Sequence, residues 1–283
     1  MKKKDLKPIE RNNPLARKLK KRAKYIKLPI VKQIYKIYRK RDLFGIEVLT
    51  DGMETQTGSP IPVNASLGTY EEQILHRKVT EYFINKAGTI VLMDCPCRTS
   101  IGCEKHDISL GCIYLGKGAA EMDLPKFPGA RLATKEEALE FERKAYEDGL
   151  IPHIGKFRGD AAHFGVVEYE HELMSICHCC SCCCVVALAK YGPSDYKQMI
   201  HRTEGVELKV DPDKCTGCGK CFKVCIYDGL RMKKDKTSIK QDNCMGCGRC
   251  ERECPSKAIS ITIDYSRIDE LLERFDSRVD ISG

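Results

Sequence analysis

The sequence has no long apolar run. No stretch of its 283 residues approaches the roughly 20 apolar residues that a membrane-spanning helix requires. The basic start, MKKKDLKPIERNN, is not followed by the apolar segment that characterises a secretory signal peptide. We therefore expect a cytoplasmic protein, with peripheral attachment to a membrane as an open alternative.

Motifs for nucleotide binding and for common hydrolytic chemistry are also absent. No G-x-G-x-x-G follows a predicted strand, and no Walker sequence is present. Neither the G-x-S-x-G turn of serine hydrolases nor the H-E-x-x-H helix of zinc proteases occurs. The sequence thus offers no support for nucleotide or flavin binding, and it identifies no catalytic residue and no substrate.

Cysteine, by contrast, is abundant, with 18 residues. In a reducing cytoplasm, clustered cysteines bind metals more often than they form disulfides. Residues 177–184 read CHCCSCCC, and neighbouring cysteines are poor disulfide partners because the bridge has a restricted geometry. The cysteine content therefore predicts metal centres.

Positive charge is concentrated at the start of the chain. Residues 1–41 contain 17 Lys and Arg and two acidic residues, a net charge of +15, which leaves −7 for the remainder because the whole chain carries +8. Apolar residues recur there at helical spacing and Pro29 divides them, which predicts a basic amphipathic helical arm. The arm could bind an anionic membrane surface or an acidic partner, or pack on the chain's own acidic part. Nucleic-acid binding is not expected, because no recognisable nucleic-acid-binding fold accompanies the charge.

Residues 42–204 mix helix and strand signals around two cysteine-rich segments. A helix pattern precedes a predicted buried strand over TIVLMD (89–94). Thr134 and Glu137 form a capping box that predicts the start of a second helix. A further strand is predicted around HFGVVEYE (163–170), before the cysteine run.

The strongest signal is an internal repeat after this region. The segments CTGCGKCFKVCIYDGLRM (215–232) and CMGCGRCERECPSKAISI (244–261) align without a gap at an offset of 29 residues. Each has the spacing C-x₂-C-x₂-C-x₃-C, in which three cysteines bind one [4Fe–4S] cluster and the fourth binds the other. Two zinc ions are the alternative ligand, but the fourth cysteine at x₃ is not typical of zinc sites.

This spacing predicts two sets of cluster ligands. The first, here named the Cys215 set, comprises Cys215, Cys218, Cys221 and Cys254. The second, the Cys244 set, comprises Cys244, Cys247, Cys250 and Cys225. Both segments resemble the bacterial-type two-[4Fe–4S] ferredoxins, with Ile226 where that family usually has the proline that Pro255 supplies in the second motif.

Ten cysteines lie upstream of the repeat. Four follow the predicted strand with the spacing C-x-C-x₅-C-x₈-C, which suits one iron–sulfur cluster or a zinc site: Cys95, Cys97, Cys103 and Cys112. Six occupy the run, which is long enough to serve one or two clusters or to leave free thiols: Cys177, Cys179, Cys180, Cys182, Cys183 and Cys184. Some of these six could instead be buried apolar residues, since the run is continued by VVALA and fits the start of a helix.

Several polar residues near these cysteines have two possible roles. Arg98 and His106 could donate hydrogen bonds or charge to a cluster, or could be ordinary loop residues. His153 and His163 flank the approach to the cysteine run, where they could be ligands, proton donors or structural residues.

A second resemblance extends over most of the chain. The basic arm, CPCRTSIGC, LATKEEALEFERKAYEDGLIPHIG, ICHCCSCCC and the paired repeat occur in that order. This arrangement is similar to a group of larger 4Fe–4S ferredoxin-like proteins of anaerobic microbes. His178 stands where that group usually has Asn, and Ser181 where it commonly has Gly. The resemblance implies a redox function and additional metal, but no particular substrate.

We therefore predict an α+β protein: an irregular cysteine-rich α/β part followed by a ferredoxin-like two-[4Fe–4S] module. Its expected regions are the basic helical arm (1–41), a cysteine-rich metal-binding domain (42–204), a ferredoxin domain (205–263) and a C-terminal helical tail (264–283).

The predicted function is electron transfer, by an iron–sulfur protein or oxidoreductase subunit of anaerobic metabolism. Electrons would pass between two [4Fe–4S] clusters, a further metal centre held by the upstream cysteines and a redox partner protein. The alternative is a zinc-stabilised docking module that delivers a ferredoxin domain to a partner and has no additional redox centre.

Overall fold

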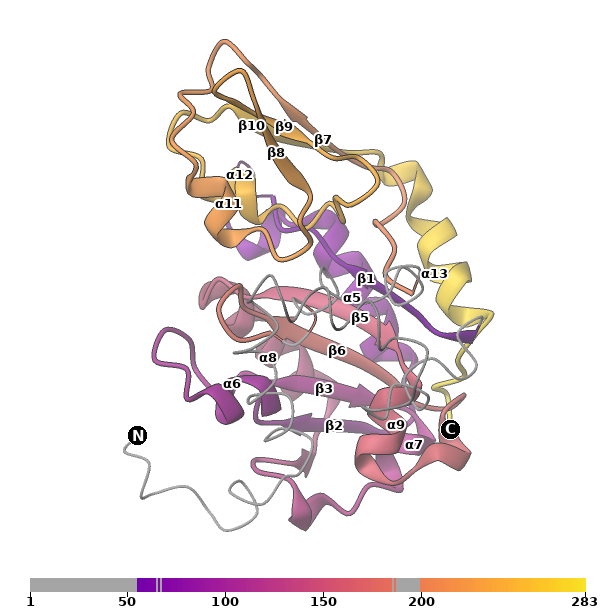
Figure 1. Cartoon of the computed structure of the whole chain (residues 1–283). Coiled ribbons are helices and arrows are strands. Elements are labelled where there is room, and N and C mark those ends of the chain that lie inside the picture. Colours follow the sequence, from indigo (N-terminus) through magenta and orange to yellow (C-terminus); the bar gives the residue numbers. More distant parts are fainter. Residues whose placement is uncertain (1–54, 65, 67, 185, 187–198) are drawn as a thin grey trace, which may run out of the picture.

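A computed structural model describes residues 55–64, 66, 68–184, 186 and 199–283 of the chain (Figure 1). The predicted basic arm, residues 1–41, lies outside these residues, as does most of the segment that continues the cysteine run. In the part that is described, no helix is both long enough and apolar enough to cross a membrane.

The larger part of the structure is built on a six-stranded sheet in the order β1-β5-β6-β3-β2-β4, and all of its neighbouring strands are antiparallel. The strands are β1 (Thr57–Pro60), β2 (Ile90–Met93), β3 (Cys112–Leu115), β4 (Arg131–Leu132), β5 (Ile151–Lys156) and β6 (Met174–Cys179). Apart from β4, they are almost entirely buried. The sheet therefore lies inside the molecule, with both faces covered.

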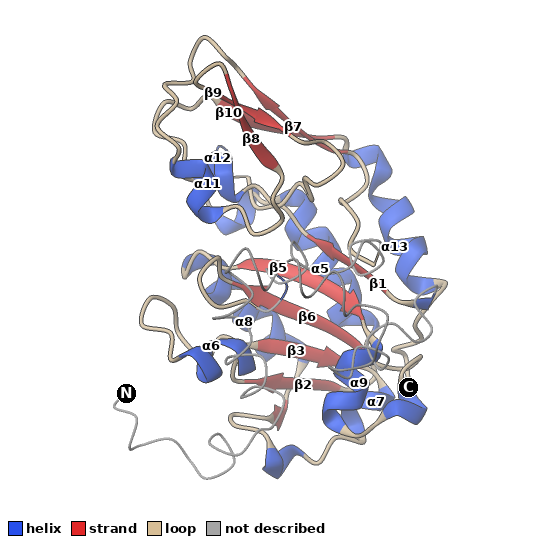
Figure 2. Ribbon diagram, in the orientation of Figure 1, coloured by secondary structure: helices blue, strands red, loops and turns tan. Residues whose placement is uncertain are grey.

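Helices cover the two faces of the sheet (Figure 2). On one face, α5 (Ile74–Lys86) and α8 (Lys135–Glu147) pack on the side chains that alternate inward along the strands, such as Ile90 and Leu92. On the other face, α7 (Lys117–Ala120) and α9 (Arg158–Phe164) pack on Val91 and Met93. Shorter elements complete this part: η3 (Tyr70–Glu72), α6 (Pro96–Ile101), η4 (Leu124–Lys126) and η5 (Val167–Tyr169).

The structure confirms several local predictions and corrects one. Thr134 and Glu137 form the predicted capping box at the start of α8, and β2 occupies the predicted buried strand. The strand predicted over residues 163–170 is wrong, because this segment contains the end of α9 and then η5. Its apolar residues are buried by packing under the sheet rather than by strand pairing, with Phe164 and Val166 in the same core cluster.

The repeat forms a smaller layer of two antiparallel strand pairs and two short helices. Its elements are β7 (Val206–Val210), α11 (Lys220–Val224), β8 (Leu230–Lys233), β9 (Lys236–Ile239), α12 (Arg249–Arg252) and β10 (Ile259–Ile263). β7 pairs with β10, and β8 pairs with β9. The mixed helix and strand content fits the predicted α+β class.

The C-terminal segment joins the repeat to the sheet. After η7 (Tyr265–Arg267), α13 (Ile268–Asp276) packs against α5, where the ring centroids of Phe83 and Phe275 are 5.7 Å apart. Gly88 then donates a backbone hydrogen bond to Ile281 O at 2.8 Å. One core cluster consequently includes residues of the sheet, the repeat and α13.

The two halves of the repeat have different surroundings. Gly219 and Gly248 occupy equivalent positions before α11 and α12, and both have a left-handed backbone, with φ of 70° and 79°. A Cβ atom on Gly219 would meet no atom within 4 Å, whereas one on Gly248 would lie 2.6 Å from Val63 O. The second half of the repeat is therefore the one that packs closely on the part built on the six-stranded sheet, here called the sheet domain.

This difference predicts unequal effects of the same substitution. Gly219→Ala should reduce the free energy of unfolding by about 1–2 kcal/mol, because a left-handed backbone is unfavourable for alanine. Gly248→Ala should cost about 1–3 kcal/mol more, because it also overpacks against Val63. Denaturant unfolding of both variants under anaerobic conditions measures the difference, and equal losses would contradict the asymmetric packing.

Candidate metal centres

The cysteine run is partly strand and partly turn. Cys177 and Cys179 belong to β6, which is paired with β3 on one side and β5 on the other. The chain then turns through residues 181–183. Within the run, strand pairing continues to Cys179. The helix predicted where VVALA continues the run lies outside the described residues, apart from Val186.

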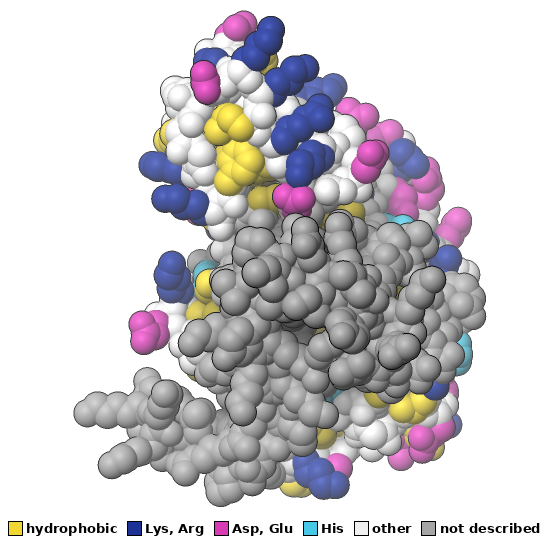
Figure 3. All heavy atoms as spheres, viewed as in Figure 1, with side chains coloured by type: hydrophobic (Ala, Val, Ile, Leu, Met, Phe, Trp, Pro, Cys, Tyr) yellow, Lys and Arg dark blue, Asp and Glu magenta, His cyan; other side chains and the backbone are white. Residues whose placement is uncertain are grey.

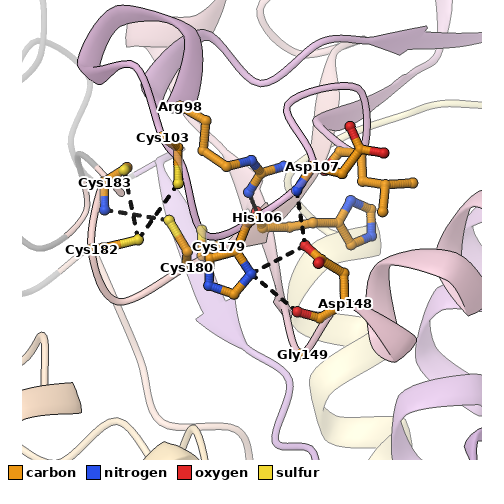
Figure 4. Close-up of polar contacts among 12 residues, drawn as sticks. Arg98, Cys103, His106, Asp107, Asp148, Gly149, Cys179, Cys180, Cys182 and Cys183 are labelled. Atoms are coloured by element: carbon orange, nitrogen blue, oxygen red, sulfur yellow. Dashed lines mark hydrogen bonds and ion pairs between the residues drawn. The ribbon is translucent and has the colours of Figure 1, made fainter. Parts of the chain in front are cut away.

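One group of thiols has the geometry of a metal site. Cys103, in the loop after α6, meets three cysteines of the run, and the Sγ atoms of Cys103, Cys180, Cys182 and Cys183 all lie within 4.8 Å of one another. Sγ of Cys182 is 3.8 Å from that of Cys103 and 3.6 Å from that of Cys183 (Figure 4). We call these four residues the Cys103 group.

The other three cysteines predicted to join Cys103 lie elsewhere. Cys95 caps α6 and accepts a hydrogen bond from Arg98 N at 3.4 Å. A hydrogen bond from Cys97, aided by the charge of Arg98 and opposed by burial, lowers the pKa of the Cys95 thiol to about 6. Cys112 lies opposite Cys177 in the ladder between β3 and β6. The structure therefore combines one residue of the upstream motif with three of the run.

Arg98 is a buried cation between these thiols. Its side chain is fully buried, and it donates hydrogen bonds to the carbonyl oxygens of His178, at 2.8 Å, and Leu110. Burial lowers the pKa of the guanidinium, but the neighbouring thiols Cys95, Cys180 and Cys112 outweigh this effect and raise it. Its Nε has no hydrogen-bond partner. Arg98 thus supplies positive charge to the region of the Cys103 group.

His106 has a different role. Its Nδ1 lies 3.1 Å from Asp148 Oδ2 and 3.0 Å from Asp148 O, so the ring is bound to the end of α8 (Figure 4). His163 packs against the rings of Phe127 and Phe164, and burial lowers its pKa. These contacts account for both histidines as structural residues.

A buried carboxylate positions the start of the run. Glu142 on α8 is fully buried and lies 2.9 Å from His76 Nε2 and 2.9 Å from His178 Nε2. His178 Nδ1 is 2.9 Å from Gly111 O. The His178 ring therefore connects the Glu142 carboxylate on α8 to the residue that precedes β3.

Both histidines act on the ionisation of the Glu142 carboxyl group. Burial raises the pKa of Glu142, but the charge of His178 and hydrogen bonds from both histidines outweigh it and lower the pKa to about 2. Sequence reasoning missed Glu142. The available signal was an acidic residue between Ala138 and Ala145 on the buried face of a predicted amphipathic helix.

Two further thiols of the run lie outside the Cys103 group. The Sγ atoms of Cys179 and Cys184 are 3.1 Å apart, and both residues are buried. His153 is buried nearby on β5, directly opposite Cys177. Burial, together with the positive charge of Arg249, lowers the pKa of His153 to about 3, and its Nε2 has no hydrogen-bond partner.

The Cys215 set lines a single pocket. All four of its cysteines contribute to the wall, together with Thr237 and Pro255 among other residues. Backbone N–H groups point at the sulfurs, with Thr237 N 3.4 Å from Cys215 Sγ and Ala258 N 3.3 Å from Cys254 Sγ. A thiol-lined pocket with amide donors has the chemistry expected for an iron–sulfur cluster.

The Cys244 set has an equivalent backbone hydrogen-bond donor, but its cysteines are more buried than those of the Cys215 set. Gly229 N donates to Cys225 Sγ at 3.3 Å, as Ala258 does to Cys254 in the other half of the repeat. Burial, followed by the charges of Cys247, Cys244 and Cys225, raises the pKa of Cys250. Thiolates at these positions would repel one another, and bound iron would stabilise them.

Residues 207–255 match the family model of a 4Fe-4S dicluster domain. We refer to this part of the chain as the dicluster domain, after the family model that it matches. The match supports the predicted ferredoxin-like module and indicates iron–sulfur electron transfer. No curated protein matches the chain.

Glu142 allows a test of how the upstream region is positioned. Glu142→Gln should reduce the free energy of unfolding by about 3–5 kcal/mol, because it removes the buried negative charge that contacts both His76 and His178. It should also lower the amount of metal retained by the upstream cysteines. Glu140→Gln, on the exposed side of the same helix, is the control and should change neither, since surface ion pairs contribute little. Similar behaviour of the two variants in denaturant unfolding and metal analysis would contradict this role.

Proposed function

We propose that the protein is an iron–sulfur electron-transfer protein, or the electron-transfer subunit of an oxidoreductase of anaerobic metabolism. In it, the dicluster domain exchanges electrons with a further metal centre. The Cys215 and Cys244 sets would hold the two [4Fe–4S] clusters, each of which accepts or releases one electron. The Cys103 group would hold the additional centre. The observation that carries this proposal is the convergence of four thiols from two separate segments.

Hydrogen-bond donors or a positive charge lie beside sulfurs of each candidate centre. In the dicluster domain, backbone amides donate to Cys215, Cys225 and Cys254. Upstream, Arg98 supplies a buried positive charge, and Cys183 N lies 3.3 Å from Cys180 Sγ. Such donors and charges raise the reduction potential of an iron–sulfur centre, because reduction adds negative charge.

The spacing within the Cys103 group also supports a second candidate function. A tetrahedral zinc site with Zn–S bonds of about 2.3 Å places its sulfurs about 3.8 Å apart. The observed Sγ distances of 3.8 Å and 3.6 Å are close to this value. In this alternative, zinc stabilises the sheet domain as a docking module and the dicluster domain alone carries electrons.

Metal content separates the two functions. The protein purified without oxygen should contain clearly more than about eight iron atoms, the number that two [4Fe–4S] clusters supply. Cys103→Ser should reduce the iron to about eight, whereas Cys215→Ser should reduce the iron of the dicluster domain and leave the upstream metal in place. About eight iron atoms together with zinc in the intact protein, and loss of that zinc in Cys103→Ser, would establish the alternative instead.

The exposed end of the dicluster domain suggests where a redox partner binds. Cys218 is exposed, and Lys214, Lys223 and Lys257 are exposed close to cysteines of the Cys215 set in the sequence. Figure 3 shows Lys and Arg side chains gathered over this part of the molecule. We propose that a partner with an acidic surface docks here.

Salt and charge reversal test this docking. The rate of electron transfer from a reduced acidic ferredoxin should fall as ionic strength rises, because salt screens the attraction that steers association. Lys214→Glu combined with Lys223→Glu should reduce the rate at low salt and weaken its salt dependence. Lys209→Glu with Lys117→Glu, at other surface positions, is the control. Equal effects of the two double variants would contradict this docking site.

A further inference from the structure

The internal repeat places two basic residues at equivalent positions with opposite environments. Lys220 lies before the third cysteine of the first motif, and Arg249, 29 residues later, lies before the third cysteine of the second. Lys220 is exposed, whereas Arg249 is buried, with 7% of its surface accessible. The difference follows from the packing of the second half of the repeat against the sheet domain.

Arg249 connects the dicluster domain to the end of β6. Its Nη2 donates to Cys179 O at 2.7 Å, and its Nη1 is buried without a hydrogen-bond partner. The guanidinium interacts electrostatically with Cys247 of the Cys244 set and with Cys179 and Cys184 of the upstream pair. It thus lies between thiols of the two parts of the protein.

No carboxylate among the described residues forms an ion pair with this cation. Its strongest electrostatic partners are Cys247, Tyr227, Cys179 and Cys184. An arginine keeps its charge when buried, and an uncompensated buried charge is strongly unfavourable, so negative charge placed next to this guanidinium is stabilised.

We propose that Arg249 is a positioning residue that raises the reduction potential of the cluster held by the Cys244 set above that of the cluster held by the Cys215 set. This inference rests on the proposed function of the dicluster domain. A reduced cluster carries one more negative charge, and a nearby cation inside the protein stabilises it much more than an exposed lysine does. The inner end of the domain, next to Cys179 and Cys184, is then the end at which an electron resides.

Midpoint potentials of the full chain test this proposal. Arg249→Gln should shift one of the two clusters to a more negative potential, with about a tenfold change in the equilibrium for electron exchange, which corresponds to about 59 mV. Lys220→Gln should leave both potentials unchanged. Paramagnetic resonance during redox titration follows both signals, and Cys215→Ser identifies the signal that belongs to the Cys215 set.

A conservative variant separates charge from structure. Arg249→Lys keeps the positive charge and loses the planar guanidinium. The midpoint potential measured in Arg249→Lys should therefore be closer to the value of the unmodified protein than the potential measured in Arg249→Gln. If Arg249→Gln loses iron, Arg249→Lys provides the test. An iron-replete Arg249→Lys variant with an unshifted potential supports the proposal, whereas a shifted potential in that variant contradicts it.

Three results would overturn the proposal: unchanged potentials in an iron-replete Arg249→Gln variant, an equal shift in Lys220→Gln, or equal shifts in the Gln and Lys variants. Failure of the proposed function looks different. In that case the unmodified protein itself would bind fewer than about eight iron atoms or give no two low-potential signals.

Discussion

A buried hydrogen bond from Arg249 to the carbonyl oxygen of Cys179 joins the two cysteine-rich parts of the protein. It joins the first turn of α12 to the last residue of β6, and both ends carry cysteines. A charged donor makes this bond stronger than a neutral one, and burial removes competing water. The contact therefore aligns the Cys244 set with the cysteine run.

The opposite side of the run is held by a comparable buried network. Arg98 donates to His178 O, while the side chain of His178 lies between Gly111 O and Glu142. The backbone at His178 is thus restrained from α6, β3 and α8 together. Once this residue is restrained, Cys177 and Cys179 extend along β6 on one face of the strand, and the turn that follows brings Cys180, Cys182 and Cys183 to Cys103.

Local spacing explains which parts of the site could be predicted from the sequence. C-x₂-C-x₂-C places three ligands within one turn, and the duplication at 29 residues identifies the fourth, so both sets of the dicluster domain follow from spacing alone. The Cys103 group joins residues 79 positions apart in the chain, from Cys103 to Cys182. No short motif encodes such a pairing, because it results from the order of β3 and β6 in the sheet.

The remaining errors have the same origin in tertiary packing. Phe164 and Val166 were expected in a strand, but they pack on one face of the sheet instead. Lys220 and Arg249 are alike in sequence, and only the docking of one half of the repeat makes one of them buried. Sequence patterns report the local conformation reliably, whereas burial of a charge depends on which surface the element finally meets.

The departure at Ile226 follows from this docking. Pro255, its counterpart in the repeat, is exposed, whereas Ile226 is buried in a small cluster with Ile200 and Tyr227 that also contacts Cys247. The aliphatic side chain of Ile226 fills space between the dicluster domain and the sheet domain. A proline ring would fill the same space but would restrict the backbone. The symmetry of the repeat is therefore broken at residues 226, 248 and 249 together. The two substitutions, at residues 226 and 249, and the close packing at Gly248 bury the same cluster site and leave the other at the surface.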